Sequence, residues 1–229
     1  MARGSPWSAQ GLAAVWATEN TREAIFAAMR RRETYATSGP RIALRFFAGW
    51  DFNEELLRAP DREQLAYAGG VPMGGILAPS AAGAAPVFAV WASKDPLGAN
   101  LDRIQIIKAW VDDNGESREK IFNVAVSDPG ERITTEGRVK PVGNTVDLDS
   151  ATYTNAIGAE ELAVVWRDPE FNGDSNAYYY ARVIEIPTPR WTTHDARALV
   201  MTPPDPGFLQ ERAVSSAIWY EPHGQSSIE

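Results

Sequence analysis

The sequence contains no cysteine and only two histidines, His194 and His223. The absence of cysteine excludes disulfide bonds, cysteine nucleophiles and cysteine-ligated zinc. It does not distinguish the cytoplasm from the periplasm, because a cysteine-free chain suits either compartment. Any catalytic or metal-binding chemistry must therefore rest mainly on carboxylates, amides and hydroxyl groups.

Positive charge and long apolar runs are also scarce. The 22 Lys and Arg residues are outnumbered by 30 Asp and Glu residues, which gives a net charge of −8. Phosphate backbones and anionic membrane surfaces attract basic proteins, so we expect no nucleic-acid partner and no membrane partner. No apolar run approaches the ~20 residues of a membrane-spanning helix, and the N-terminus shows no signal peptide. These features predict a soluble, acidic protein of the cytoplasm or the periplasm.

The residues that are abundant favour β-structure. Aromatic side chains make up 10% of the sequence, and they suit the half-buried surface of a sheet. Several short strands joined by turns predict a mainly β fold, a β-sandwich-like (immunoglobulin-like) domain over residues 41–222, followed by a polar tail at 223–229. We predict that residues 161–167 and 177–186 form a hairpin. The predicted strands cover residues 41–48, 87–93, 102–111, 120–127, 161–167, 177–186 and 215–220.

Residues 1–40 differ from the rest of the chain. An apolar run at 12–17 predicts a strand, and a helix is expected over 21–33, with Asn20 as its N-cap. Ile25, Ala28 and Met29 fall on one face of that helix. Because this apolar face needs a partner, we expect a homodimer or a missing N-terminal domain to cover it.

Two stretches between these regions carry weaker signals. Residues 51–70 are charged and fit either a short helix or a loop. Residues 71–86 are rich in Gly, Ala and Pro, which predicts a long surface loop.

Several sequence segments, taken in order, resemble one known family. They include GLAAVWATENTREAIFAAMRRRETYATSGPRIALRFFAGWDF, GVPMGG, DPLGANLDRIQIIKAW and YYYARVIEIPTPRWTTHDA. The chain resembles the C-terminal portion of the uncharacterised family DUF 3604, and the resemblance runs through nearly its whole length.

The resemblance implies a metal-dependent parent protein. The part that precedes this portion in the family resembles a metal-binding barrel of the polymerase-and-histidinol-phosphatase (PHP) type, so residues 1–40 would be the last strand–helix unit of such a barrel. A divalent metal is then implied for the full-length parent. This chain has no His-x-His motif. We therefore expect an accessory or structural portion of a metal-dependent hydrolase, without catalysis of its own.

Two alternatives stay open. The chain could itself be a small metal-dependent hydrolase or lyase that uses acidic side chains and His194. It could also be a carbohydrate- or aromatic-binding module, because tryptophan side chains can form a platform for such ligands. The tryptophans considered for that platform are Trp50, Trp91, Trp110, Trp166, Trp191 and Trp219.

Catalytic candidates are few. His194 and Asp195 are neighbours and could pair as an oriented general base, although adjacent residues seldom face each other. Glu185 interrupts an apolar strand, so we expect it to be partly buried and paired with Arg190 or Arg212. Its pKa could then be perturbed in the way that marks functional sites. His223 lies in the polar tail.

One segment has the spacing of a metal-binding loop. Asp168, Glu170, Asn172 and Asp174 occupy positions 1, 3, 5 and 7 of a segment with glycine at position 6. This spacing is typical of an EF-hand calcium loop, but the twelfth position is tyrosine where a bidentate glutamate is needed. A turn-rich loop between two strands is the simpler interpretation.

Overall fold

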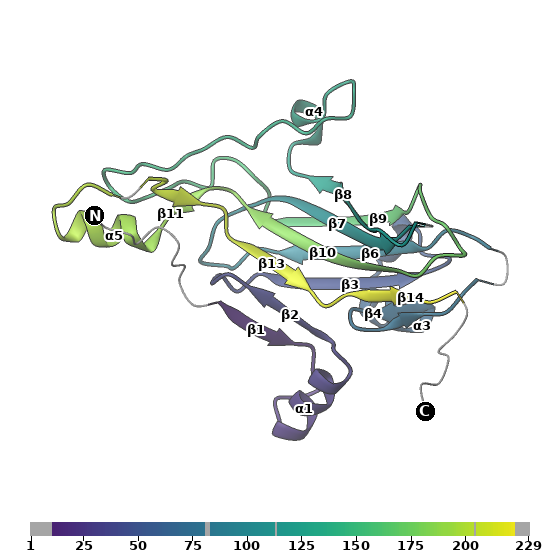
Figure 1. Ribbon diagram of the computed structural model, residues 1–229. Coiled ribbons are helices and arrows are strands. Elements are labelled where there is room, and N and C mark those ends of the chain that lie inside the picture. The colour runs from purple at the N-terminus through teal and green to yellow at the C-terminus, as the bar shows by residue number, and fades with distance from the viewer. Residues whose placement is uncertain (1–10, 81–82, 113, 204, 223–229) are drawn as a thin grey trace.

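Two mainly antiparallel sheets pack face to face in the computed structural model, which describes residues 11–80, 83–112, 114–203 and 205–222 (Figure 1). This arrangement confirms the predicted mainly β, sandwich-like fold. Sheet A contains β1 (Leu12–Val15), β2 (Thr34–Thr37), β5 (Ile76–Leu77), β7 (Leu101–Val111), β8 (Ser117–Val126), β10 (Ala177–Glu185), β13 (Arg212–Ser215) and β14 (Ile218–Tyr220). Sheet B contains β3 (Ala43–Gly49), β4 (Gly70–Pro72), β6 (Val87–Ser93) and β9 (Glu161–Arg167).

Strand β10 is the centre of sheet A. It pairs with β7 on one side, and β7 pairs in turn with β8. On its other side β10 pairs with β13 and β14, which lie one after the other along the strand. Beyond β13 lie β2 and then β1, whereas β5 runs parallel to β14. Sheet B has the simpler order β4-β3-β6-β9.

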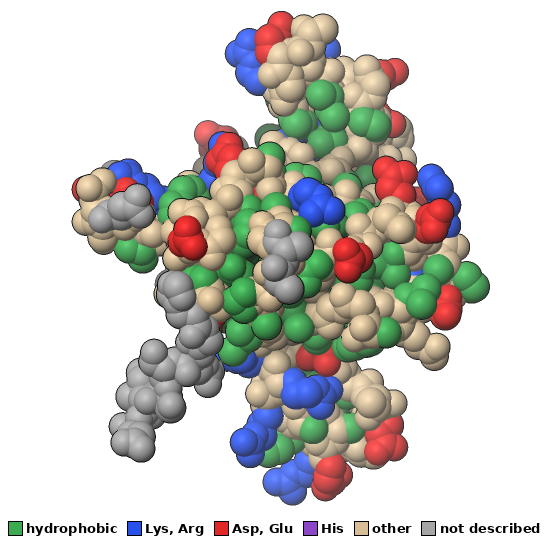
Figure 2. Space-filling model, turned by 90° about the vertical axis from the view of Figure 1, so that its right-hand side faces the viewer, with side chains coloured by type: hydrophobic (Ala, Val, Ile, Leu, Met, Phe, Trp, Pro, Cys, Tyr) green, Lys and Arg blue, Asp and Glu red, His purple; other side chains and the backbone are tan. Residues whose placement is uncertain are grey.

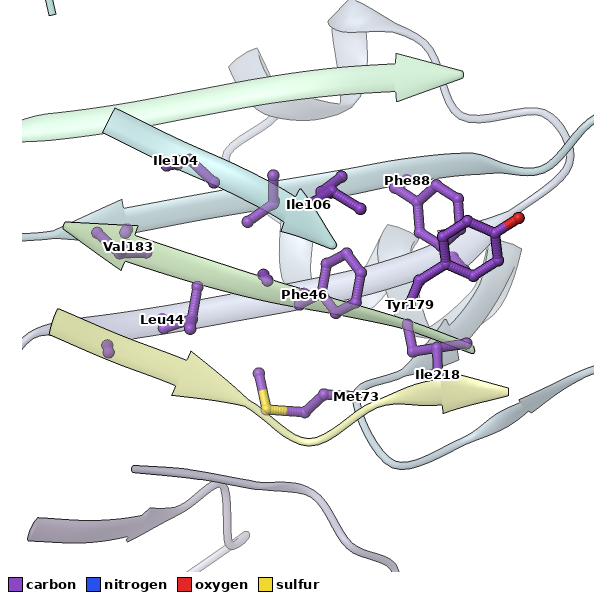
Figure 3. Packing of buried hydrophobic residues seen from close by; sticks show 14 of the residues in the cluster. Leu44, Phe46, Met73, Phe88, Ile104, Ile106, Tyr179, Val183 and Ile218 are labelled. Carbon is purple, nitrogen blue, oxygen red and sulfur yellow. The ribbon is translucent and has the colours of Figure 1, made fainter. Parts of the chain in front are cut away.

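The main hydrophobic core lies between the two sheets (Figure 3). Alternate residues of each strand point inward, as the two-residue period of a strand requires. In β10 every odd-numbered residue from Ala177 to Glu185 is buried. The rings of Phe46 and Phe88 from sheet B stack at 5.6 Å, and Tyr179 from sheet A lies 4.5 Å from Phe88. Other members of this core are Leu44, Met73, Ile104, Ile106, Val183 and Ile218.

The outer face of sheet B is covered by two helices. They are α2 (Glu54–Arg58) and α3 (Arg62–Gly69), so the ambiguous stretch 51–70 is largely helical. A second cluster joins Phe47, Ala89 and Trp91 of the sheet to Leu56 and Ala66 of the helices. Sheet B is therefore buried on both faces, which explains why β6 is apolar from Val87 to Ala92.

The other helices lie outside the sandwich. They are α1 (Arg22–Arg30), α4 (Pro129–Arg132) and α5 (Trp191–Ala198), and a two-stranded pair of β11 (Thr188–Pro189) and β12 (Phe208–Leu209) precedes and follows α5. The N-cap of α1 is Thr21, whose hydroxyl accepts a hydrogen bond from the backbone N–H of Ala24. The prediction of Asn20 as the cap was wrong by one residue.

Two predictions about connections are also wrong. β9 and β10 do not form a hairpin, because β9 pairs with β6 in sheet B and β10 belongs to sheet A. The segment 168–176 therefore crosses from one sheet to the other. Residues 71–86 are not only a surface loop, since they contain β5 and the core residue Met73.

The opening strand and helix are joined to the sandwich. β1 is antiparallel to β2 over four residue pairs, and β2 is antiparallel to β13. The indole N–H of Trp16 donates to the backbone carbonyl of Leu44 in sheet B at 2.8 Å. The proposed relation of residues 1–40 to a barrel, and the domain boundary at residue 40, stay predictions.

Candidate functional site

The crossing segment 168–176 closes one end of the sandwich and holds the buried carboxylate of Asp168. Asp168 Oδ2 accepts hydrogen bonds from Lys108 Nζ and from the Tyr179 hydroxyl group, both at 2.7 Å. Lys108 Nζ also donates to the carbonyl oxygen of Glu170 at 2.6 Å. Since Lys108 and Tyr179 lie opposite each other on β7 and β10, the sheet itself aligns the two donors on one acceptor.

The ion pair between Lys108 and Asp168 is buried. The side chains of Lys108 and Asp168 are 6% and 0% exposed, so water hardly screens the pair. Burial first, and then the negative charge of Asp168, raise the pKa of Tyr179. The tyrosine is therefore a hydrogen-bond donor at neutral pH and stabilises the carboxylate.

The contacts made by the four residues of the predicted calcium loop do not gather their side chains around a common point. Asp168 turns inward to Lys108, and a carboxylate oxygen of Glu170 pairs with Lys120. Asn172 makes local contacts only, to Ser175 and to the backbone of Asp174. Among the described residues no group of three or more His, Cys, Asp or Glu side chains is placed to hold a metal ion. Calcium binding stays a prediction that these contacts do not favour.

Aromatic rings hold the same segment in place. The ring of Phe171 packs 4.9 Å from Tyr220 and 6.3 Å from Trp50. The hydroxyl group of Tyr220 donates to the carbonyl oxygen of Gly173 at 2.8 Å. With both its start and its middle anchored, the segment forms a rigid wall.

A hollow of about 160 Å³ lies against this wall. Its floor comes from β7 and β10 and its rim from the β7–β8 turn and the crossing segment. The lining residues are Lys108, Trp110, Asp112, Glu170, Asn172, Ser175 and Ala177.

Glu185 lies at the opposite end of β10 and is 1% exposed. Its burial was predicted, but its predicted ion pair with Arg190 or Arg212 is absent, and its Oε1 atom has no hydrogen-bond partner among the described residues. Burial raises its pKa to about 8, with the nearby charges of Glu211 and Asp95 adding to the shift. The carboxyl group is therefore largely protonated at neutral pH.

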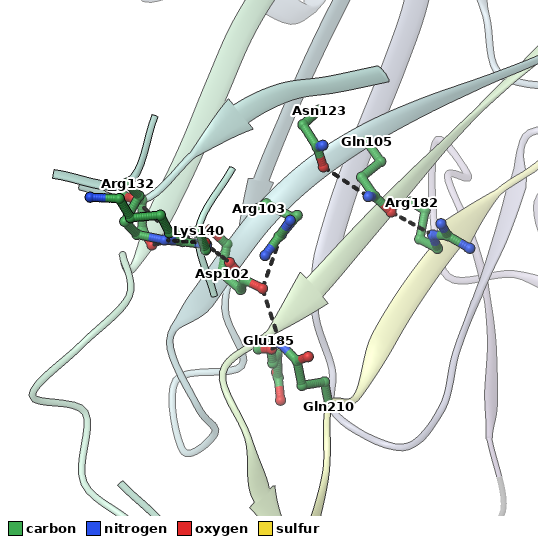
Figure 4. A network of polar contacts seen from close by, with 10 residues as sticks. Asp102, Arg103, Gln105, Asn123, Arg132, Lys140, Arg182, Glu185 and Gln210 are labelled. Atoms are coloured by element: carbon green, nitrogen blue, oxygen red, sulfur yellow. Dashed lines mark hydrogen bonds and ion pairs between the residues drawn. The ribbon is translucent and has the colours of Figure 1, made fainter. Parts of the chain in front are cut away.

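Behind Glu185 lies a polar network that the sequence did not reveal (Figure 4). The buried carboxylate of Asp102 accepts from Arg132 Nη2 at 2.5 Å, from Arg103 Nε at 3.0 Å and from Gln210 Nε2 at 3.0 Å. Gln210 Nε2 also donates to the backbone carbonyl of Glu185. Because every member binds its neighbours, the network fastens the long 127–140 excursion to sheet A.

His194 and Asp195 are both exposed on α5. Neither side chain makes a hydrogen bond or an ion pair with another residue in the part of the chain that the structure describes. The structure thus does not bring the imidazole and the carboxylate together, and their catalytic role stays a prediction. His223 lies outside the described residues.

No helix within the described residues is both long and apolar enough to cross a membrane.

Comparisons with known proteins match the chain to a family. Residues 2–222 match the family described as "Protein of unknown function (DUF3604)". A search of curated proteins and a search of solved structures each found no match. Since the matched region covers nearly the whole sequence, the chain belongs to the DUF3604 family.

Proposed function

We propose that this chain is an accessory, non-catalytic portion of a metal-dependent hydrolase and that it docks onto the hydrolase domain through β1 and α1. One observation carries the proposal: large apolar side chains of this unit are exposed although the unit is firmly attached to the sandwich. Leu12, Phe26 and Met29 are 44%, 60% and 57% exposed. We refer to these three side chains as the α1 patch.

Only part of the predicted helix face is covered by the chain itself. Ala28 is fully buried and Ile25 is half-buried, whereas Met29 faces solvent. Beside the helix, β1 has β2 as its only strand partner among the described residues. An edge strand next to exposed apolar side chains offers both backbone hydrogen bonds and apolar area to a partner.

The charge around the patch differs from that of the whole protein. Residues 22–32 contain four arginines and one glutamate, in a chain whose net charge is −8. Figure 2 shows these basic side chains on the protrusion at the bottom of the view. We therefore expect the docking partner to present an acidic rim around an apolar centre.

The attachment of the unit is rigid enough to fix the direction of docking. Glu33, three residues after the end of α1, is buried and accepts a hydrogen bond from the hydroxyl group of Tyr67 in α3. The guanidinium of Arg45 lies 3.6 Å from the same carboxylate and 3.5 Å from the centre of the Trp16 ring. These contacts join the unit to both sheet B and its helical cover.

The chemistry of the buried charged groups fits a scaffold. Asp168 is committed to Lys108 and Tyr179, and Asp102 is committed to Arg132. Each of these carboxylates stabilises the fold through partners that a substrate would have to displace.

The test is a binding measurement between two separately expressed pieces. This chain is titrated calorimetrically with the purified metal-binding portion of a full-length family member. We expect a saturable complex that the double variant Phe26→Asp/Met29→Asp weakens at least tenfold. Leu97→Asp, at an exposed leucine of the β6–β7 loop, is the matched control and should bind normally.

Two other results would overturn the proposal. Stoichiometric zinc, manganese or iron bound by this chain alone would favour an independent metalloenzyme. A dimer that the Phe26→Asp/Met29→Asp variant dissociates would assign the α1 patch to a second copy of the chain.

A further inference from the structure

We propose that the hollow beside the crossing segment 168–176 binds one neutral sugar residue, either a monosaccharide or the terminal residue of a glycan. The proposal is independent of docking through the α1 patch, because the two surfaces share no residue. It rests on the shape of the hollow, on the hydrogen-bonding groups that line it and on their charges.

The hollow suits a single ring. Its volume of about 160 Å³ is below the ~300–1,000 Å³ typical of sites for drug-sized ligands. Its walls are preorganised, since Asp168 and Phe171 anchor the crossing segment to the core. A rigid site loses little conformational entropy on binding, which favours small ligands.

The lining offers hydrogen-bond donors and acceptors together. Two of the three N–H groups of Lys108 are used by Asp168 and Glu170, which leaves the third. The indole N–H of Trp110 and the Oε2 atom of Glu170 have no hydrogen-bond partner among the described residues. The hydroxyl group of Ser175 accepts from Asn172 at 2.9 Å and can still donate. Sugar hydroxyls both donate and accept, so they match this mixture.

The charged groups of the lining are already paired within the chain. Lys108 is paired with Asp168, Asp112 with Arg118 and Glu170 with Lys120. An ionic ligand of either sign would have to compete with these partners. A neutral ligand with several hydroxyl groups needs no such exchange.

Trp110 supplies the apolar surface that such a ligand needs. Its ring is only partly buried and lines the hollow. Lys108 Nζ lies 5.3 Å from the centre of this ring, so the ammonium and the aromatic surface border the same space. A pyranose has an apolar face of C–H groups and a polar edge, which can contact the ring and the charged groups together.

The experiment uses the full chain and four probes: glucose, galactose, mannose and N-acetylglucosamine. Saturation-transfer difference NMR detects binding, and a titration gives its strength. We expect at least one sugar to bind with roughly millimolar affinity and to saturate. Ser175→Phe, which fills the hollow from a half-buried position at its rim, should abolish the signal, and Trp110→Ala should weaken it at least tenfold.

Two controls make the result decisive. Asp174→Ala lies on the same segment but outside the lining, and Trp219→Ala removes an exposed tryptophan elsewhere; both should bind as the unaltered protein does. The circular dichroism spectrum of Ser175→Phe checks that the fold is intact. Absence of saturable binding for all four sugars, or equal binding by the folded Ser175→Phe variant, would overturn the proposal.

Discussion

The hydroxyl group of Tyr67 donates a hydrogen bond to the carboxylate of Glu33, which lies 34 residues earlier in the chain. This bond joins the segment after α1 to the helix that covers sheet B. Glu33 is buried, and Arg31 and Arg45 lie within 3.3 Å and 3.6 Å of its oxygen atoms. The opening unit is thus held by a charged cluster as well as by strand pairing.

Removing this hydroxyl group should destabilise the fold. We expect Tyr67→Phe to lower the free energy of unfolding by about 1–3 kcal/mol, because a buried carboxylate loses a donor. Urea unfolding followed by tryptophan fluorescence measures the change. Tyr178→Phe is the control, since its hydroxyl group has no hydrogen-bond partner among the described residues, and its effect should stay within about 0.5 kcal/mol. Equal effects of the two variants would contradict the role given to Glu33.

The buried ion pair of Lys108 and Asp168 should show strong coupling. Lys108→Met leaves an uncompensated buried carboxylate, so we expect a loss of about 3–5 kcal/mol of unfolding free energy. Adding Asp168→Asn should restore part of that loss, because the charge left behind is then removed. Lys120→Met, which breaks the exposed contact with Glu170, should cost at most about 1 kcal/mol. Strictly additive effects of the first two substitutions would show that the pair is not coupled.

Stability should depend on pH through Glu185. Its pKa is raised from 4.5 to about 8 in the folded protein, so the folded state binds the proton more tightly than the unfolded state. This contribution is fully present below about pH 4.5 and is lost as the pH rises to about 8, with a slope of at most about 1.4 kcal/mol per pH unit. Glu185→Gln should flatten this slope and be more stable than the unaltered protein at pH 8. Chemical unfolding at four pH values compares the two, and parallel profiles would contradict the assignment.

The excursion at 127–140 should loosen when Arg132 is removed. Arg132 binds Asp102, Ser127 and the backbone carbonyl of Lys140, so we expect Arg132→Ala to expose the segment to trypsin under native conditions. The time course of cleavage, followed by mass spectrometry, gives the change. Arg138→Ala, at an exposed position in the same segment, should leave the cleavage of the other sites unchanged. An unchanged pattern in Arg132→Ala would show that the network does not hold the excursion.

The sequence could predict the strands better than their partners. A continuous apolar run predicted β6 at residues 87–93, as observed, because a strand buried on both faces needs apolar residues throughout. We predicted that β9 pairs with β10 because strands that are neighbours in the sequence usually pair. The prediction was wrong, because the nine residues between them carry the chain to the other sheet. Nothing local in the sequence distinguishes a hairpin loop from such a crossing.

For the candidate sites too, the sequence predicted single residues better than their contacts. The burial of Glu185 could be predicted from its place in an apolar strand, but its surroundings depend on loops from distant parts of the chain. Asp102 and Arg132 were missed because the arginine comes from an irregular excursion with no periodic pattern. Asp168 was named only as a candidate metal ligand, and its partner Lys108 lies 60 residues away in the sequence. Contacts between residues so far apart in the sequence depend on the order in which the strands are arranged in the sheets.

The pairing of β2 with β13 has a consequence for synthesis of the protein on the ribosome. β13 and β14 are among the last residues of the fold to leave the exit tunnel, and both lie beside the central strand β10. Until they emerge, β10 has one open edge and β2 has no partner on its inner side. Sheet A can therefore close only after β13 and β14 have left the exit tunnel, and until then the nascent chain carries two unpaired strand edges that chaperones would have to shield.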